Sequence, residues 1–115
     1  MKVSFNGINE SIATFYAAQG VVPGEPVKLV DSGKVGTCAA NDKFIGIALN
    51  VTEDRFASVL LKGYVTFTYT GSVVPTLGKT KLLADGLGSI KGSATGDEYI
   101  AIELATTAKT IGLLI

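Results

Sequence analysis

Short runs of β-forming residues, separated by turn signals about every ten residues, constrain the fold of this chain most strongly. Most of the runs alternate apolar and polar residues, which is typical of half-buried strands. Asp31-Ser32-Gly33 and Asp85-Gly86 supply turn chemistry between flanking runs. The predicted strands are 11–17, 26–31, 34–38, 43–50, 56–70, 79–84, 88–91, 98–105 and 110–115. This pattern predicts an all-β fold, a small single-domain β-barrel or β-sandwich of short antiparallel strands.

The best helical alternative is residues 9–18, where Asn9 could act as an N-cap. The β-branched and aromatic residues of that segment favour a strand instead. With 115 residues, the chain has the length of one domain. We therefore expect an extended N-terminal arm over residues 1–10 and one β domain over residues 11–115.

The sequence also contains an internal echo. "VVPGEPVKLVDSGKV" (21–35) matches "VVPTLGKTKLLADGLGSI" (73–90), and "NDKFIGIAL" (41–49) matches "GDEYIAIEL" (96–104). The offsets are 52 to 55 residues. One such unit is too small to bury its own apolar face, so two of them are expected to pack together. The echo predicts two similar β-units at about 21–70 and 73–115.

Charge and composition narrow the classes of partner. Charged residues make up 17% of the chain and the formal net charge is zero, which favours association of a small domain. The lysines are scattered among acidic residues and there is one arginine, so no basic stripe exists for nucleic acid. No run resembles a membrane span or a signal peptide. We expect no nucleic-acid or membrane partner, and a protein that stays in the compartment where it is made.

Catalytic chemistry has few candidate groups. The chain has no histidine, the side chain most used for acid–base catalysis and metal binding. Cys38 is the sole cysteine and is expected to be a small buried hydrophobe. The adjacent acids Glu53-Asp54 and Asp97-Glu98 do not converge by sequence, because neighbours in a strand point to opposite faces. The sequence predicts no enzyme, no cofactor and no metal site.

The stretch "SVLLKGYVTFTYTG" (58–71) raises a question about its polar face. Alternation places Tyr64, Thr66, Thr68 and Thr70 together on a face that carries little charge. Hydroxyl groups can be satisfied at a protein interface without the burial of charge. We therefore expect part of this face to pack against a neighbouring chain; the alternatives are that it is exposed or covered by a loop of its own chain.

A second candidate contact lies at the N-terminus. The segment "MKVSFNG" (1–7) stands outside the echo and carries Phe5 as a possible anchor. An extended segment can add a strand to a partner's sheet. The predicted residues of contact with a partner or a neighbouring subunit are Lys2, Val3, Ser4, Phe5 and Asn6, together with the four residues of the polar face. The alternative is that this segment forms a first strand of the chain's own barrel.

Several stretches resemble a known family. "NESIATFYAAQGVVPGEPVKLVDSGKVGTCAANDKFIGIALN", "ASVLLKGYVTFTYTG" and the closing "KLLADGLGSIK…TIGLLI" are similar to head decoration, or capsid-stabilising, proteins of tailed bacteriophages and prophages. The resemblance covers nearly the whole chain, and it rests on the order and spacing of motifs that are individually weak. It implies a β-rich virion protein on the outer capsid surface that clamps neighbouring major capsid protein subunits. It also implies a homo-oligomer, with a trimer favoured.

Two other functions compete with this expectation. A carbohydrate- or ligand-binding β-module displayed on the virion surface would need exposed aromatic residues. The chain has no tryptophan, the usual sugar platform, although four tyrosines are available. A small enzyme on a β scaffold is disfavoured by the absence of histidine and of a convergent set of carboxylates.

Overall fold

The computed structural model describes residues 10–115, and these residues form ten strands and no helix. The strands are β1 (Ser11–Ala17), β2 (Pro26–Asp31), β3 (Lys34–Thr37), β4 (Gly46–Val51), β5 (Phe56–Lys62), β6 (Tyr64–Thr70), β7 (Gly78–Ala84), β8 (Ile90–Gly92), β9 (Asp97–Ala105) and β10 (Thr110–Leu114). The predicted all-β fold is confirmed, and the segment considered as a helix forms strand β1. Over the described part of the chain, nothing helical is long and apolar enough to cross a membrane.

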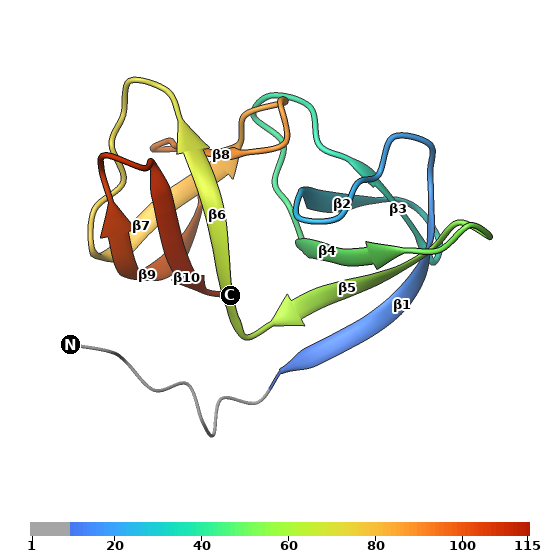
Figure 1. Ribbon diagram of the computed structural model, residues 1–115. Coiled ribbons are helices and arrows are strands. Elements are labelled where there is room, and N and C mark those ends of the chain that lie inside the picture. Colours follow the sequence, from blue (N-terminus) through green and yellow to red (C-terminus); the bar gives the residue numbers. More distant parts are fainter. Residues whose placement is uncertain (1–9) are drawn as a thin grey trace.

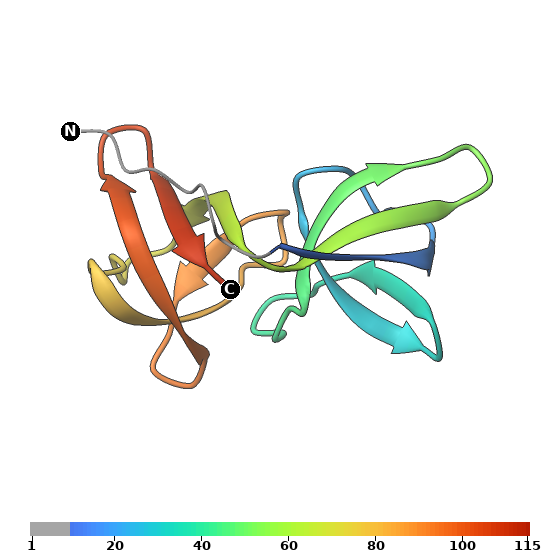
Figure 2. The same cartoon turned by 90° about the horizontal axis from the view of Figure 1, so that it is seen from below.

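The strands close into two small barrels that lie side by side (Figures 1 and 2). The strand order is β1-β3-β2-β4-β5 in the first barrel and β10-β6-β8-β7-β9 in the second. In each barrel the first strand pairs in parallel with the third, and the other pairs are antiparallel. The two barrels therefore share one topology, which confirms the prediction of two similar β-units.

The boundary between the units differs from the one expected. Residues 56–70 are not one strand, because the chain leaves the first barrel after β5 and enters the second at β6. Gly63 makes this passage with φ of 136°, a conformation that a residue with a side chain rarely adopts. The barrels thus contain residues 11–62 and 64–114, rather than 21–70 and 73–115. The alternation of apolar residues continues through Gly63, which is why the sequence pattern did not reveal the break.

The apolar core extends from one barrel into the other. The first barrel has a core of small side chains: Ala17, Val21, Val27, Val35, Ala48, Ala57 and Val59. A second cluster fills the second barrel and also includes Cys38, Phe44, Ile47 and Leu60 of the first. The ring of Phe44 is stacked on Tyr99 at a centroid distance of 5.1 Å and meets Phe67 edge-on at 5.5 Å. The Phe44 ring therefore packs between the two barrels and joins their apolar cores.

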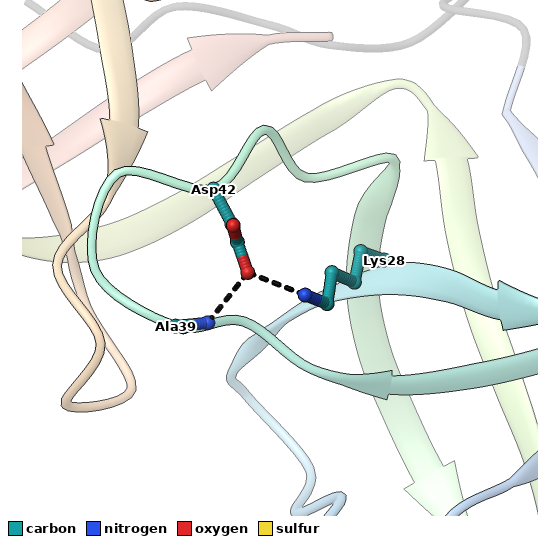
Figure 3. A network of polar contacts seen from close by, with 3 residues as sticks. All are labelled: Lys28, Ala39 and Asp42. Atoms are coloured by element: carbon teal, nitrogen blue, oxygen red, sulfur yellow. Dashed lines mark hydrogen bonds and ion pairs between the residues drawn. The ribbon is translucent and has the colours of Figure 1, made fainter.

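The segment between β3 and β4 also holds the barrels together. The Asp42 carboxylate accepts hydrogen bonds from the Lys28 ammonium, at 2.5 Å, and from the Ala39 backbone N–H, at 2.8 Å (Figure 3). The backbone next to it bonds to the end of β7: Asn41 N–H donates to the Ala84 carbonyl, and Ala84 N–H donates to the Asp42 carbonyl. Asp42 thus fixes a loop that connects the first barrel to the second.

This loop predicts a specific pH dependence of stability. The hydrogen bonds from Lys28 and then Ala39 lower the pKa of Asp42 below its ordinary value of 3.8. The folded state therefore gains stability from ionised Asp42 above pH 3.8, and loses that gain as the pH falls through the lower folded-state pKa. We expect Asp42→Asn to have a lower urea midpoint than the wild type at pH 6, and this gap to close as the pH falls below the unfolded-state pKa. Asp54→Asn, a change at an exposed turn residue, is the control. A difference in urea midpoint between the wild type and Asp42→Asn that is the same at every pH would contradict this role of Asp42.

Candidate interaction surface

The outer side of the first barrel carries an uncharged patch, which we call the β1–β5 face. It is formed by Ile12, Thr14 and Tyr16 of β1 with Phe56 and Ser58 of β5. Tyr16 and Ile12 are 59% and 54% exposed, and Phe56 is 38% exposed. The five residues carry no charge, and Lys34 of β3, which pairs with Tyr16, borders their aromatic end. Exposed aromatic side chains are typical of the central part of a protein interface, and charged residues of its rim.

Local hydrogen bonds fix the aromatic end of this face. The β4–β5 turn is closed by backbone bonds from Thr52 N–H to the Phe56 carbonyl and from Arg55 N–H to the Thr52 carbonyl. The Thr52 hydroxyl accepts the Phe56 N–H. The Arg55 guanidinium, in the same turn, donates to the Ala18 carbonyl at the end of β1. Because β1 and β5 are held in register there, Tyr16 lies opposite Phe56, with ring centroids 4.8 Å apart. The two exposed rings therefore form one fixed platform.

The second barrel carries the corresponding face on β6 and β10, and this is the face predicted from the sequence. Tyr64, Thr66, Thr68 and Thr70 point to the same side, since they alternate with buried residues along β6. The Thr70 hydroxyl donates to the Asp85 carboxylate at 2.6 Å, and the Thr68 and Ser89 hydroxyls are 2.5 Å apart. A loop of the same chain thus supplies hydrogen-bond partners for the Thr68 and Thr70 hydroxyls. The sequence analysis expected a neighbouring chain to supply such partners.

The remaining polar-face residues contact their own barrel or solvent. Thr66 is exposed and lies opposite Gly112 of β10. The ring of Tyr64 covers Gly112, because a Cβ added there would be 2.3 Å from the Tyr64 hydroxyl oxygen. Whether this face contacts another chain stays a prediction. The other predicted contact residues, Lys2, Val3, Ser4, Phe5 and Asn6, lie outside the described residues.

The sequence reasoning missed the β1–β5 face. In the common topology Tyr16 and Phe56 correspond to the threonine pair Thr68 and Thr110, so the same outer position carries aromatic residues in one barrel and hydroxyls in the other. The signal available in the sequence was "TFY" at 14–16, which matches "TFT" at 66–68 with an offset of 52 residues. That match would have identified an aromatic substitution on an outward position.

A small cleft lies between the barrels and offers little reactive chemistry. Its volume is about 250 Å³. It is lined by Glu25, Pro26, Thr37 and Cys38 of the first barrel and by Ala84, Gly86, Leu87, Gly88 and Ser89 near the second. Burial raises the pKa of the Cys38 thiol to about 11, so this group is protonated at neutral pH and is a poor nucleophile. Across residues 10–115, no group of three or more cysteine and carboxylate side chains is placed to hold a metal ion.

Comparison with known proteins does not assign a family. A scan against protein-family models gives no match, and a search of curated proteins gives no significant match.

Proposed function

We propose that this chain is a structural virion protein that binds the outer surface of a phage capsid and stabilises contacts between major capsid protein subunits. The observation that carries the proposal is the β1–β5 face, a platform of uncharged residues with an exposed aromatic pair, bordered by Lys34. The resemblance of the sequence to head decoration proteins supports it independently. The proposal assigns no catalytic step and no cofactor to the chain.

The physical properties of the two barrels suit such a role. A decoration protein has to bind the same site many times over, so a preformed contact surface lowers the entropic cost of each binding event. The shared apolar cluster and the Asp42 loop fix the barrels to each other. Fixed Tyr and Phe side chains supply large contact area with few rotatable bonds. In this proposal the protein is made in the bacterial cytoplasm, assembles on the head as a homo-oligomer, with a trimer favoured, and remains on the outside of the virion.

Co-sedimentation with undecorated heads tests the proposal. We expect saturable binding of the wild type at a copy number set by the symmetry axes of the shell. The double variant Tyr16→Ser/Phe56→Ser removes the aromatic platform, and we expect its dissociation constant to rise by roughly thirtyfold, the effect of losing one interface hot spot of about 2 kcal/mol. Bound copies per head at increasing protein concentration give the measurement.

The control is Leu29→Ser, which also removes an exposed apolar side chain of the first barrel. Leu29 lies on β2, which pairs with neither β1 nor β5. We expect this variant to bind heads as the wild type does. Equal binding of the double variant would exclude the β1–β5 face as the contact, whereas no binding of the wild type would exclude the decoration function itself.

A second candidate is a carbohydrate- or ligand-binding module on the virion surface. The observation that favours it is the exposed Tyr16–Phe56 pair, since aromatic faces can stack on sugar rings. This candidate predicts binding on a glycan array that is lost in the same double variant. It also predicts that the double variant sediments with heads as the wild type does, because the aromatic pair then binds sugar and not the shell.

A further inference from the structure

The second barrel presents one apolar side chain almost entirely to solvent. Leu87 is 87% exposed, more than any other large hydrophobic residue of the described chain. It lies in the five-residue connection between β7 and β8, residues 85–89, whereas the equivalent connection between β2 and β3 has only residues 32 and 33. The longer turn is therefore a feature of the second barrel alone.

The turn that carries Leu87 is held in one conformation. The Asp85 carboxylate accepts hydrogen bonds from the backbone N–H groups of Leu87, at 2.7 Å, and Ser89, at 3.0 Å. The glycines on either side have positive φ and pack closely on the first barrel, Gly86 against Ala40 and Gly88 against the Glu25 side chain. Leu87 is thus a preorganised apolar knob, so its burial by a partner would cost little ordering entropy.

A groove with matching properties lies elsewhere on the second barrel. Its volume is about 290 Å³, and it is lined by Val73, Val74, Pro75, Thr76, Lys79, Thr80, Lys81, Gly92, Ser93 and Ala94. A cavity of about 150 Å³ can hold benzene, so this groove has room for a leucine side chain. Val73 is 57% exposed here, whereas Val21, which corresponds to it in the first "VVP" segment, is 4% exposed. The groove is therefore also specific to the second barrel.

The knob and the groove lie at opposite ends of one hairpin. β7 runs towards the first barrel, so the 85–89 turn lies beside that barrel (Figure 1). The groove lies at the other end, near Lys79 at the start of β7 and Gly92 at the end of β8. Because the two features are separated along the hairpin, Leu87 cannot fill the groove of its own chain. A second copy of the chain can bring its knob to this groove.

The charges around the two features are complementary. Glu25 and Asp85 flank the knob, and Lys79 and Lys81 line the groove. Lys79 also forms an exposed ion pair with Glu98 at 4.0 Å, which leaves the groove with one more lysine than that pair uses. We propose that copies of this chain associate head to tail, with Leu87 of one copy in the Val73–Ala94 groove of the next. Such a contact joins two different surfaces, so it either closes into a ring or continues as a filament. This inference concerns the free protein and does not rest on the capsid proposal.

Disulfide trapping between two variants, each with one new cysteine in a Cys38→Ala background, tests the contact. Leu87→Cys and Val74→Cys are prepared separately, mixed without phage heads and exposed to a mild oxidant. We expect a cross-linked dimer in the mixture that neither variant forms alone. A mixture of Leu87→Cys with Val22→Cys is the matched control, because Val22 has the same place in the first "VVP" segment. No excess of cross-linking over this control, or equal cross-linking of Leu87→Cys with itself, would overturn the proposal.

Sedimentation equilibrium gives an independent measurement. We expect wild-type protein to associate, and Leu87→Ser to raise the dissociation constant by about tenfold or more, since it removes the buried leucine. Leu29→Ser removes an equally apolar, exposed side chain outside the contact and is expected to associate as the wild type does. A wild type that stays monomeric, or a Leu87→Ser variant that associates equally well, would contradict the proposed contact.

Discussion

Replacement of Phe44 by alanine is expected to lower the free energy of unfolding by about 3–5 kcal/mol, the usual cost of deleting a buried aromatic side chain. Phe44 is buried and contacts Phe67 and Tyr99, so its removal leaves a cavity between the two barrels. Because each barrel is a closed sheet, the surrounding strands cannot readily move in to fill that cavity. Chemical denaturation followed by circular dichroism measures the loss. The cost is a large fraction of the 5–15 kcal/mol that is typical of a small domain.

The matched control is Phe56→Ala, which deletes the same side chain from an exposed position. Within residues 10–115 its ring contacts that of Tyr16 alone, and we expect a loss of about 1 kcal/mol. Because the apolar cluster includes residues of both barrels, wild-type protein is expected to unfold in one transition. Two separate unfolding transitions of the wild type, of which Phe44→Ala shifts only one, would show that Phe44 does not couple the unfolding of the two barrels.

The strands were predictable because their signals are local. The predicted segments 11–17 and 26–31 coincide with β1 and β2, and the alternation of Val65, Phe67 and Tyr69 identified the buried side of β6. Turn residues between such runs act over a few positions, so no distant contact is needed to place them. The path of the chain at Gly63 was not predictable in the same way, because it depends on which barrel each strand joins.

The repeat was detectable, but its register was not. The sequence echo aligns 41–49 with 96–104, an offset of 55 residues. In the sheets, the unpaired bulge residue is Leu49 in β4 and Ile102 in β9, which gives an offset of 53 (102 minus 49). A shift of two residues keeps every side chain on its side of the strand, so an alternating pattern cannot distinguish the two alignments.

The β1–β5 face was not predictable for a related reason. The segment "SIATFYA" has apolar residues at both odd and even positions, so its pattern does not tell which side of β1 faces inward. Closure of the barrel decides this, because it places Ala13, Phe15 and Ala17 inside and leaves Tyr16 outside next to Phe56. The platform exists only through the pairing of two strands that are distant in the sequence.

Gly46→Ala is expected to destabilise the first barrel by about 3 kcal/mol, the upper end of the usual cost of overpacking a core. A Cβ at Gly46 would be 2.1 Å from the Leu60 carbonyl oxygen and 3.1 Å from a Val59 methyl carbon. The first contact is with backbone of the neighbouring strand β5, so relief requires the separation of β4 from β5. The sequence echo would align Gly46 with Ala101 and suggest that alanine is tolerated, but the bulge register removes that equivalence.

The control for this substitution is Ala48→Gly on the same strand. Ala48 is buried, and its change to glycine removes one methyl group and adds backbone freedom, at a cost of about 1 kcal/mol. The addition of one methyl group at position 46 is thus expected to cost more than the removal of one at position 48. Denaturant midpoints of the two variants decide the order.

If Gly46→Ala proves as stable as the wild type, β4 and β5 are not as close at this position as the sheet register requires. If it unfolds first, the close approach of these strands fixes the orientation of β5, and with it the position of Phe56 on the outer face.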